Sequence, residues 1–215
     1  MPKTTKIVPA ILVNNKAGFK RQFDKVKPYF KYIQIDIMDG ILVKEKNSIN
    51  PQIVKTMLRG YKIEVHLMVK DVSKYIEQWH KLKNVKKIIW HYEAEKDKDA
   101  ILCLNKYLRS KKIQTGLAVN PNTSLAKIKD LIPKFNTIQI MGIKPGAQGR
   151  KFQPKVLKKI KSLRQKYPKL NIAVDGGVSE QNFAAIKKAG ANIIAIGSYL
   201  QKSKDTKQAL KKLPR

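Results

Sequence analysis

Two acidic residues and a histidine close three runs of β-branched residues. Asp36 lies in "YIQIDIM", Asp175 ends "IAVD", and His66 lies in "IEVHLM", while His91 and Glu93 follow "KIIW". Two carboxylates on opposite sides of one carbon can remove a proton from one face and return a proton to the other. Histidine and aspartate are also ligands for zinc, iron or manganese. These residue types predict proton transfer at a carbon beside a carbonyl, assisted by a cation.

Each of these residues also has an ordinary structural explanation. An Asp before two glycines often forms only a turn, and a His at a strand end more often makes a hydrogen bond than binds a metal. Asp39, in "MDG", fits either a turn or a carboxylate that supports the site. We expect His80 and Asp24 to have only a structural role. The placement of several candidates at strand ends is what favours a site.

Three late loops contain glycines of the kind that lets backbone N–H groups approach an anion. They follow the runs "TIQIM", "NIAVD" and "NIIAI", and barrels frequently bind phosphate after their last strands. Lys144 and Arg150 would add positive charge to the first of these loops. The candidate phosphate-binding residues are Gly146, Gly149, Gly176, Gly177, Gly197 and Ser198.

The elements that would position these residues repeat along the chain. Runs rich in β-branched residues alternate with amphipathic stretches roughly every 25 residues. The expected strands are residues 6–13, 32–38, 62–68, 87–92, 113–119, 137–143, 171–177 and 192–198. Parallel pairing follows, because each return to the sheet needs a helix-length crossover. The sequence predicts an α/β fold in which residues 1–215 form a single (β/α)8 TIM barrel domain.

A closed barrel also accounts for a carboxylate on an inner strand. Gln34, Asp36 and Met38 share one face of their strand, and the alternating isoleucines share the other. The carboxyl ends of barrel strands face the mouth, where active sites of this fold are built. An open doubly wound sheet would instead show a glycine-rich turn after its first strand, which "ILVNNKAGF" lacks.

Three of the expected helices have clear boundary signals. One begins after Asp71, another has Pro154 in its first turn, and a third begins at Ser179 and ends at Gly190. The apolar stripe expected on the first consists of Val72, Tyr75, Ile76, Trp79 and Leu82. The spacing therefore predicts outer helices that pack one face against the strands.

The chain is strongly basic, with 46 Lys and Arg against 15 Asp and Glu and a formal net charge of +31. Such a field attracts polyanions and accelerates the arrival of anionic ligands. The lysines are spread over almost every expected helix, and the sequence contains no zinc-finger spacing, recognition-helix signature or aromatic RNA-binding motif. Dedicated nucleic-acid binding is therefore not expected.

The single cysteine and the absence of long apolar runs bear on the compartment. Cys103 has no partner for an intrachain disulfide, and its helical spacing with Ile101 and Leu104 predicts a core position. No apolar run approaches the roughly 18 residues that a membrane-spanning helix needs. We expect a cytoplasmic protein that makes no membrane contact.

Taken together, the motifs resemble the ribulose-phosphate 3-epimerase family. The matching segments are "IDIMDG", "VHLM", "MGIKPGAQGRKF", "VDGGV" and "AGAN" followed by "GS", in the family's order and spacing. The resemblance implies a barrel of the ribulose-phosphate-binding type and metal-dependent epimerisation at C3 of a ketose phosphate. The implied reaction interconverts D-ribulose 5-phosphate and D-xylulose 5-phosphate through an enediolate. A sugar phosphate is the implied partner, and we expect a homo-oligomer.

The resemblance also implies roles for individual residues. Asp36 and Asp175 match the paired acid and base, and both match metal ligands together with His66. One divalent ion (Zn, Fe, Mn, Co or Mg) is the implied cofactor. The residues that match the family's substrate-lining positions are His66, Met38, Met68 and Met141, and its phosphate cradle is matched by the late glycines and Ser198.

Two positions depart from the family pattern. Gln34 stands where the family has a His two residues before the first catalytic Asp, and Ala10 stands where it has a Ser. An amide oxygen is a poorer ligand than imidazole for zinc or iron, so Gln34 makes a doubtful fourth ligand. We expect weaker metal binding with a preference for manganese or magnesium. Two alternatives stay open: a hexulose phosphate substrate such as allulose 6-phosphate, and a barrel without catalysis that binds a phosphate ligand or nucleic acid.

Overall fold

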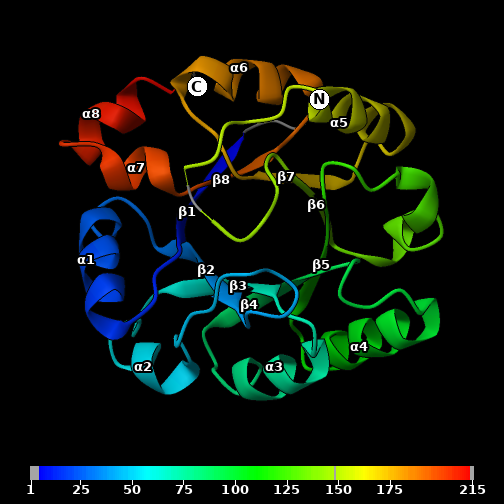
Figure 1. The fold of residues 1–215 in the computed structure, drawn as a ribbon, viewed down its shortest axis with the longest axis horizontal. Helices are drawn as coiled ribbons and strands as arrows, with labels where there is room; N and C mark the ends of the chain where they lie inside the picture. Colours follow the sequence, from blue (N-terminus) through cyan, green and yellow to red (C-terminus); the bar gives the residue numbers. More distant parts are fainter. Residues whose placement is uncertain (1–4, 148, 214–215) are drawn as a thin grey trace.

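Parallel strands close into a ring in the computed structural model, which describes residues 5–147 and 149–213. Within these residues each strand pairs in parallel with the next, and β8 pairs with β1 to complete the eight-stranded barrel (Figure 1). The predicted TIM barrel is thereby confirmed. The strands are β1 (Lys6–Ile11), β2 (Tyr32–Met38), β3 (Lys62–Met68), β4 (Val85–His91), β5 (Gln114–Val119), β6 (Thr137–Met141), β7 (Asn171–Asp175) and β8 (Ile193–Ile196).

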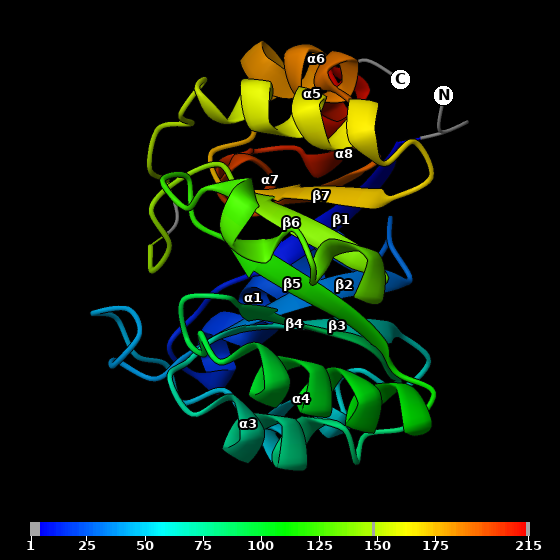
Figure 2. The same cartoon turned by 90° about the vertical axis from the view of Figure 1, so that its right-hand side faces the viewer.

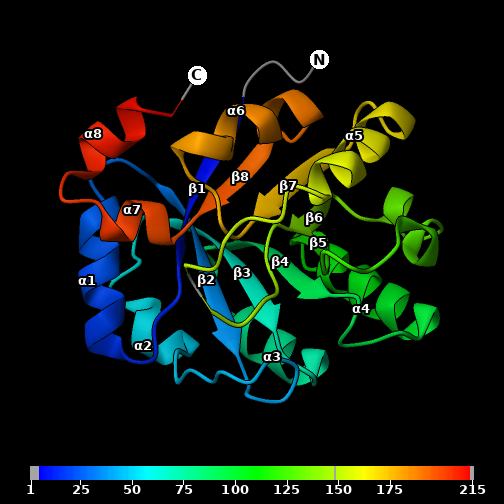
Figure 3. The same cartoon turned by 45° about the horizontal axis from the view of Figure 1, so that its top comes forward.

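Helices surround this ring and cover its outer surface, as the tilted view of Figure 3 shows. The α-helices are α1 (Lys16–Val26), α2 (Pro51–Lys55), α3 (Val72–Trp79), α4 (Lys98–Ser110), α5 (Val156–Lys166), α6 (Glu180–Ala189), α7 (Ser198–Lys202) and α8 (Thr206–Lys211). The connection from β5 to β6 carries two short 3-10 helices instead, η1 (Leu125–Ile128) and η2 (Ile132–Lys134).

Local capping chemistry sets several of these boundaries. The carboxylate of Asp71 accepts the N–H of Lys74 at 3.1 Å and begins α3 as predicted. Ser179 opens α6 with a capping box, and Gly190 ends it at a φ of 113°. Pro154 differs from the prediction, because α5 begins only at Val156 and the proline lies in the preceding turn.

The predicted core position of Cys103 is wrong, since its side chain is exposed. The buried side of α4 is formed by Ile101, Asn105 and Leu108. Cys103 lies two residues after Ile101, which places it roughly 200° around a helix of 3.6 residues per turn. Its spacing therefore matches the solvent side of the helix.

The strand register brings the candidate residues to one level of the barrel. Asp36 of β2 lies beside His66 of β3, and Met141 of β6 lies beside Asp175 of β7. The isoleucines of β2 point outward into the core shared with the helices, whereas Gln34 is buried on the opposite, inner face. Alternation within the strands thus directs the polar residues into the barrel.

Two long loops project from the carboxyl end of the barrel. Figure 2 shows the light-blue loop after β2 and the yellow-green loop after β6 on the same side of the molecule. Arg150 of the second loop lies 3.4 Å from Glu45 of the first, measured between Nη2 and Oε1. Both loops therefore border the barrel mouth. Across the described residues, no helix has the length and apolar character that crossing a bilayer requires.

Candidate active site

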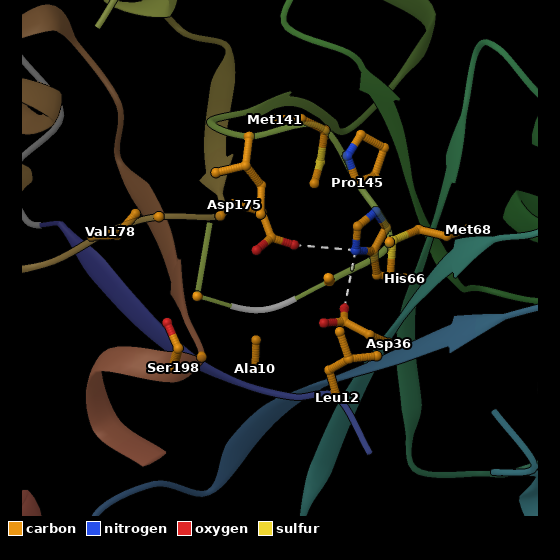
Figure 4. A pocket seen from close by; sticks show the side chains of 17 residues that line it. Ala10, Leu12, Asp36, His66, Met68, Met141, Pro145, Asp175, Val178 and Ser198 are labelled. Carbon is orange, nitrogen blue, oxygen red and sulfur yellow. Dashed lines mark hydrogen bonds and ion pairs between the residues drawn. The ribbon is translucent and has the colours of Figure 1, made fainter. Parts of the chain in front are cut away.

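A cavity opens at the carboxyl ends of the strands, and its empty space is about 460 Å³ when the part open to solvent is included. Its wall contains predicted site residues and others that were not predicted, and Figure 4 shows how they face one another. The selected residues that line it are Asp36, His66, Met68, Met141, Gly146, Gly149, Asp175, Gly176, Gly177, Gly197 and Ser198. Ala10, Leu12, Ile143, Pro145, Ala147 and Val178 complete the wall.

Asp36 and Asp175 converge on His66 from two sides of this cavity, as the dashed lines in Figure 4 mark. The Nδ1 atom of His66 lies 3.0 Å from Oδ1 of Asp36 and 3.1 Å from Oδ2 of Asp175. One ligand atom from each residue falls within 4.8 Å of the other two, and all three side chains are buried. Two carboxylate oxygens and an imidazole nitrogen are a donor set that fits a divalent metal ion.

The pKa values of Asp36 and His66 are both raised, for different reasons. Burial and the nearby charge of Asp175 raise the pKa of Asp36, although hydrogen bonds from His66 and Gln34 oppose that shift. Burial by itself would lower the pKa of His66, but hydrogen bonding to Asp175 and Asp36 outweighs it and raises that pKa to about 10. Without a metal ion, His66 is therefore an imidazolium between two acids at neutral pH.

Gln34 lies at the centre of this group and takes part in it through its amide nitrogen. Its Nε2 donates hydrogen bonds of 2.7 Å to Oδ1 of Asp36 and 2.7 Å to Oδ2 of Asp175. Its Oε1 is buried and has no hydrogen-bond partner within the described parts of the chain. In this orientation the amide links the two carboxylates. A half-turn of the amide would instead offer its oxygen as a fourth metal ligand.

The three methionines predicted to line the site are divided between two apolar clusters. Met68 and Met38 belong to one cluster with Val43, and Leu12 packs against it. Met141 belongs to another cluster, with Ile89 and Ala118. Met68 and Met141 reach the cavity, whereas Met38 is not part of its wall. Thioether side chains give the cavity an apolar, polarizable surface beside the acids.

The glycines after β6 and β7 allow their loops to approach one another closely. Gly176 and Gly177 have φ values of 99° and 70°, a region that side chains seldom adopt. A Cβ atom on Gly177 would lie 2.7 Å from the backbone nitrogen of Phe152 in the loop after β6. Arg150 supports this loop from outside, donating to the carbonyl of Lys144 at 2.9 Å.

Gly177→Ala is expected to lower stability and to weaken phosphate binding together. The strained φ costs about 1–3 kcal/mol, and the loop must also move away from the new methyl group. We expect affinity for inorganic phosphate to fall at least about 10-fold, since small displacements strongly weaken positioned contacts. Thermal unfolding and calorimetric titration with phosphate measure the two effects.

Gly60→Ala is the matched control for this variant. Gly60 has a similar φ of 82°, but a Cβ there would meet no atom within 4 Å. Its substitution should cost stability through the backbone alone and leave phosphate binding unchanged. Equal phosphate affinity in both variants would contradict the predicted role of Gly177 in phosphate binding.

Other candidates from the sequence have different positions. Asp39 accepts N–H groups from Ile41, Leu42 and Lys70, which supports its interpretation as a turn residue. His91 and Glu93 lie behind His66 and are absent from the cavity wall.

Gln139 was missed by the sequence analysis. Its Nε2 donates to Oδ2 of Asp175 at 3.3 Å. It precedes Met141 by two residues, just as Gln34 precedes Asp36, so a polar residue at an inward strand position was the available signal.

Comparison with known proteins places this chain in a family. The sequence profile of the ribulose-phosphate 3-epimerase family matches residues 6–201. A ribulose-phosphate 3-epimerase from Schizosaccharomyces pombe is 32% identical over 199 residues, covering 90% of this chain and 85% of that protein. One from Helicobacter pylori J99 is 31% identical over 214 residues, covering 97% and 96%.

Solved structures show the same fold at lower identity. The crystal structure of KGPDC from Streptococcus mutans has a TM-score of 0.73 at 12% identity, covering 98% of this chain and 96% of that one. A 3-hexulose-6-phosphate synthase has a TM-score of 0.68 at 15% identity, covering 97% of each chain. These two similarities show the barrel fold alone, whereas the sequence matches also show the family. With the profile matching nearly its whole length, the chain belongs to the ribulose-phosphate 3-epimerase family.

Proposed function

We propose that this protein epimerises C3 of a ketose phosphate, interconverting D-ribulose 5-phosphate and D-xylulose 5-phosphate. The observation that carries the proposal is the convergence of Asp36 and Asp175 on one cavity, each about 3 Å from the same atom of His66. The two residues come from β2 and β7, so they approach a bound carbon from different sides. Family membership supports the same reaction.

In the proposed reaction the two acids exchange roles across the substrate. One carboxylate removes the C3 proton, and the bonding electrons move into the C2 carbonyl to give an enediolate. The other acid then donates its proton to the opposite face of C3, which inverts the centre. The raised pKa of Asp36 beside a second carboxyl supports this cycle, because it favours one protonated and one ionised acid.

A divalent metal ion fits the proposed site, held by Asp36, His66 and Asp175. When bound, it would act as a Lewis acid that polarises the substrate carbonyl and stabilises negative charge on oxygen. Gln34 provides an amide where the family has a histidine, so we propose that the site prefers manganese or magnesium over zinc. Tight stoichiometric zinc binding would contradict that preference.

Solvent deuterium exchange tests the proposed function directly. The protein, supplied with Mn²⁺, is incubated in D₂O with D-ribulose 5-phosphate and, in parallel, with allulose 6-phosphate. Incorporation at C3 of the pentulose with formation of xylulose 5-phosphate supports the proposal. Faster exchange of the hexulose phosphate would shift the substrate to that sugar. Exchange of neither compound with any of Zn²⁺, Mn²⁺, Co²⁺, Fe²⁺ or Mg²⁺ would reject epimerisation.

Metal affinity should rise with pH. The pKa of His66 is about 10 without metal, so a metal ion must displace the proton that Nδ1 carries at neutral pH. Below that pKa each unit of pH increases the unprotonated fraction about tenfold, so the Mn²⁺ dissociation constant should fall by about the same factor. Calorimetry in buffers of different ionisation enthalpy at pH 6.5–8.5 would report about one released proton. A dissociation constant that does not change with pH would exclude His66 Nδ1 as a ligand.

Compartment and assembly stay predictions. A relative from Oryza sativa that is 29% identical bears the name of a cytoplasmic isoform, which supports the expected location. The expected homo-oligomer would appear by light scattering coupled to size-exclusion chromatography, and a monomeric mass would contradict it.

A further inference from the structure

A buried chain of hydrogen bonds runs from His66 away from the cavity. The Nε2 atoms of His66 and His91 lie 2.9 Å apart, and Nδ1 of His91 lies 3.3 Å from Oε2 of Glu93. The two rings are 20° from parallel with centroids 5.1 Å apart, so the nitrogens meet edge to edge. Both histidines are fully buried. Solvent therefore offers no alternative partner to these ring nitrogens.

The outer end of this chain is a firmly held carboxylate. Oε1 of Glu93 accepts the backbone N–H of Asn120 at 2.9 Å and the hydroxyl of Thr123. Burial alone would raise the pKa of Glu93, but hydrogen bonds from His91 and Thr123 outweigh it and lower that pKa. The side chain is thus an ionised acceptor whose Oε2 faces His91.

The polarity of every bond in the chain follows from that acceptor. An ionised carboxylate has no proton to give, so Nδ1 of His91 must carry the hydrogen. Only one hydrogen fits between the two Nε2 atoms at 2.9 Å, and a neutral His91 ring that carries its hydrogen on Nδ1 has a lone pair on Nε2 to accept it. Nε2 of His66 must then be the donor. Gln139 also approaches that atom at 3.3 Å, but its amide hydrogen can bond to Asp175 instead.

We propose that Glu93 acts through His91 as a positioning residue, which fixes His66 in the Nε2–H tautomer and directs its Nδ1 lone pair at Asp36 and Asp175. A lone pair that faces two carboxylates at about 3 Å requires a positive charge among the three groups. A proton supplies it in the metal-free protein, and a metal ion supplies it when bound. A residue outside the cavity thereby determines the donor character of the metal site.

Glu93→Gln should reverse the direction of this chain with almost no change of shape. The amide oxygen must stay at the Oε1 position, because the N–H of Asn120 and the hydroxyl of Thr123 both donate there. The amide NH₂ group then faces Nδ1 of His91, which becomes an acceptor. His91 must then carry its hydrogen on Nε2, so Nε2 of His66 must accept and the one hydrogen left on His66 lies on Nδ1. That tautomer has no lone pair on Nδ1 for a metal ion.

The experiment compares Glu93→Gln with two controls. Thr123→Val removes a donor to the same carboxylate but keeps the acceptor that faces His91. Glu77→Gln makes the same chemical change at an exposed residue of α3. Mn²⁺ affinity is measured by electron paramagnetic resonance, and ¹⁵N NMR of the histidine rings identifies which nitrogens carry hydrogen. Circular dichroism first establishes that each variant is folded.

We expect Glu93→Gln to weaken Mn²⁺ binding about 10- to 100-fold, the usual range for a residue that orients a metal ligand. Both controls should stay within about threefold of the parent, even if Thr123→Val unfolds at a lower temperature. In the metal-free parent the ¹⁵N spectrum should show His91 protonated on Nδ1, and in Glu93→Gln it should show the proton on Nε2.

Three outcomes would overturn the proposal. They are a parent spectrum with His91 protonated on Nε2, an unchanged His91 spectrum in folded Glu93→Gln, and an equal loss of Mn²⁺ affinity in Thr123→Val. The parent spectrum decides the matter even if Glu93→Gln does not fold. The inference rests on the proposed metal site, but the tautomer of His91 is read without metal. Failure of the proposed epimerase function is therefore distinguishable from failure of this chain of hydrogen bonds.

Discussion

Asp36→Asn and Asp175→Asn are each expected to reduce epimerisation of D-ribulose 5-phosphate by about 10²–10⁴-fold, the range for loss of a general acid or base. An amide neither accepts the C3 proton nor returns one, and it is a weaker metal ligand than a carboxylate. Both residues face the cavity beside His66, so either loss breaks the proton path. Epimerisation and solvent deuterium incorporation at C3 measure the effect.

Asp130→Asn is the charge-matched control for both variants. Asp130 is exposed and pairs with Lys98 at the protein surface. Its loss should leave the rate within about twofold of the parent, because exposed ion pairs contribute little. Activity close to that of the parent in either Asp36→Asn or Asp175→Asn would contradict the two-base mechanism.

Gln34→Leu should destabilise the metal-free protein on the order of 3 kcal/mol. The substitution removes two charge-assisted hydrogen bonds of 2.7 Å, each worth about 1.5–3 kcal/mol, and leaves His66 as the donor that Asp36 and Asp175 still share. Protonation of one carboxyl offsets part of that loss. Urea denaturation at pH 7.5 in the presence of a chelator would measure the free energy of unfolding.

Gln139→Leu provides the comparison for this variant. Gln139 is equally buried but makes a longer bond of 3.3 Å to Asp175, so its replacement should cost less. A third variant, Gln34→His, should raise the affinity for zinc, because an imidazole nitrogen replaces the amide. Equal stability losses in the two leucine variants would show that Gln34 does not link the carboxylates.

Much of the architecture followed from local patterns in the sequence. Alternating β-branched runs and helices required parallel strands, and eight repeats were enough to predict closure into a barrel. Residues at strand ends then had to face the mouth, which is why the sequence alone predicted Asp36, His66 and Asp175 as site residues. Similar reasoning gave a wrong prediction for Cys103. Its two apolar neighbours do not show which side of the helix is buried, because that depends on how the helix packs against the rest of the barrel.

The sequence by itself determined the barrel and the acids and histidine at its mouth, because side-chain alternation and crossover length are local properties of the chain. The tertiary structure decided what those groups do to one another. The bonds from Gln34 to both carboxylates and from His66 through His91 to Glu93 join residues of different strands. Their polarity depends on register, burial and hydrogen-bond direction across the closed ring, which exist only after all the strands have paired.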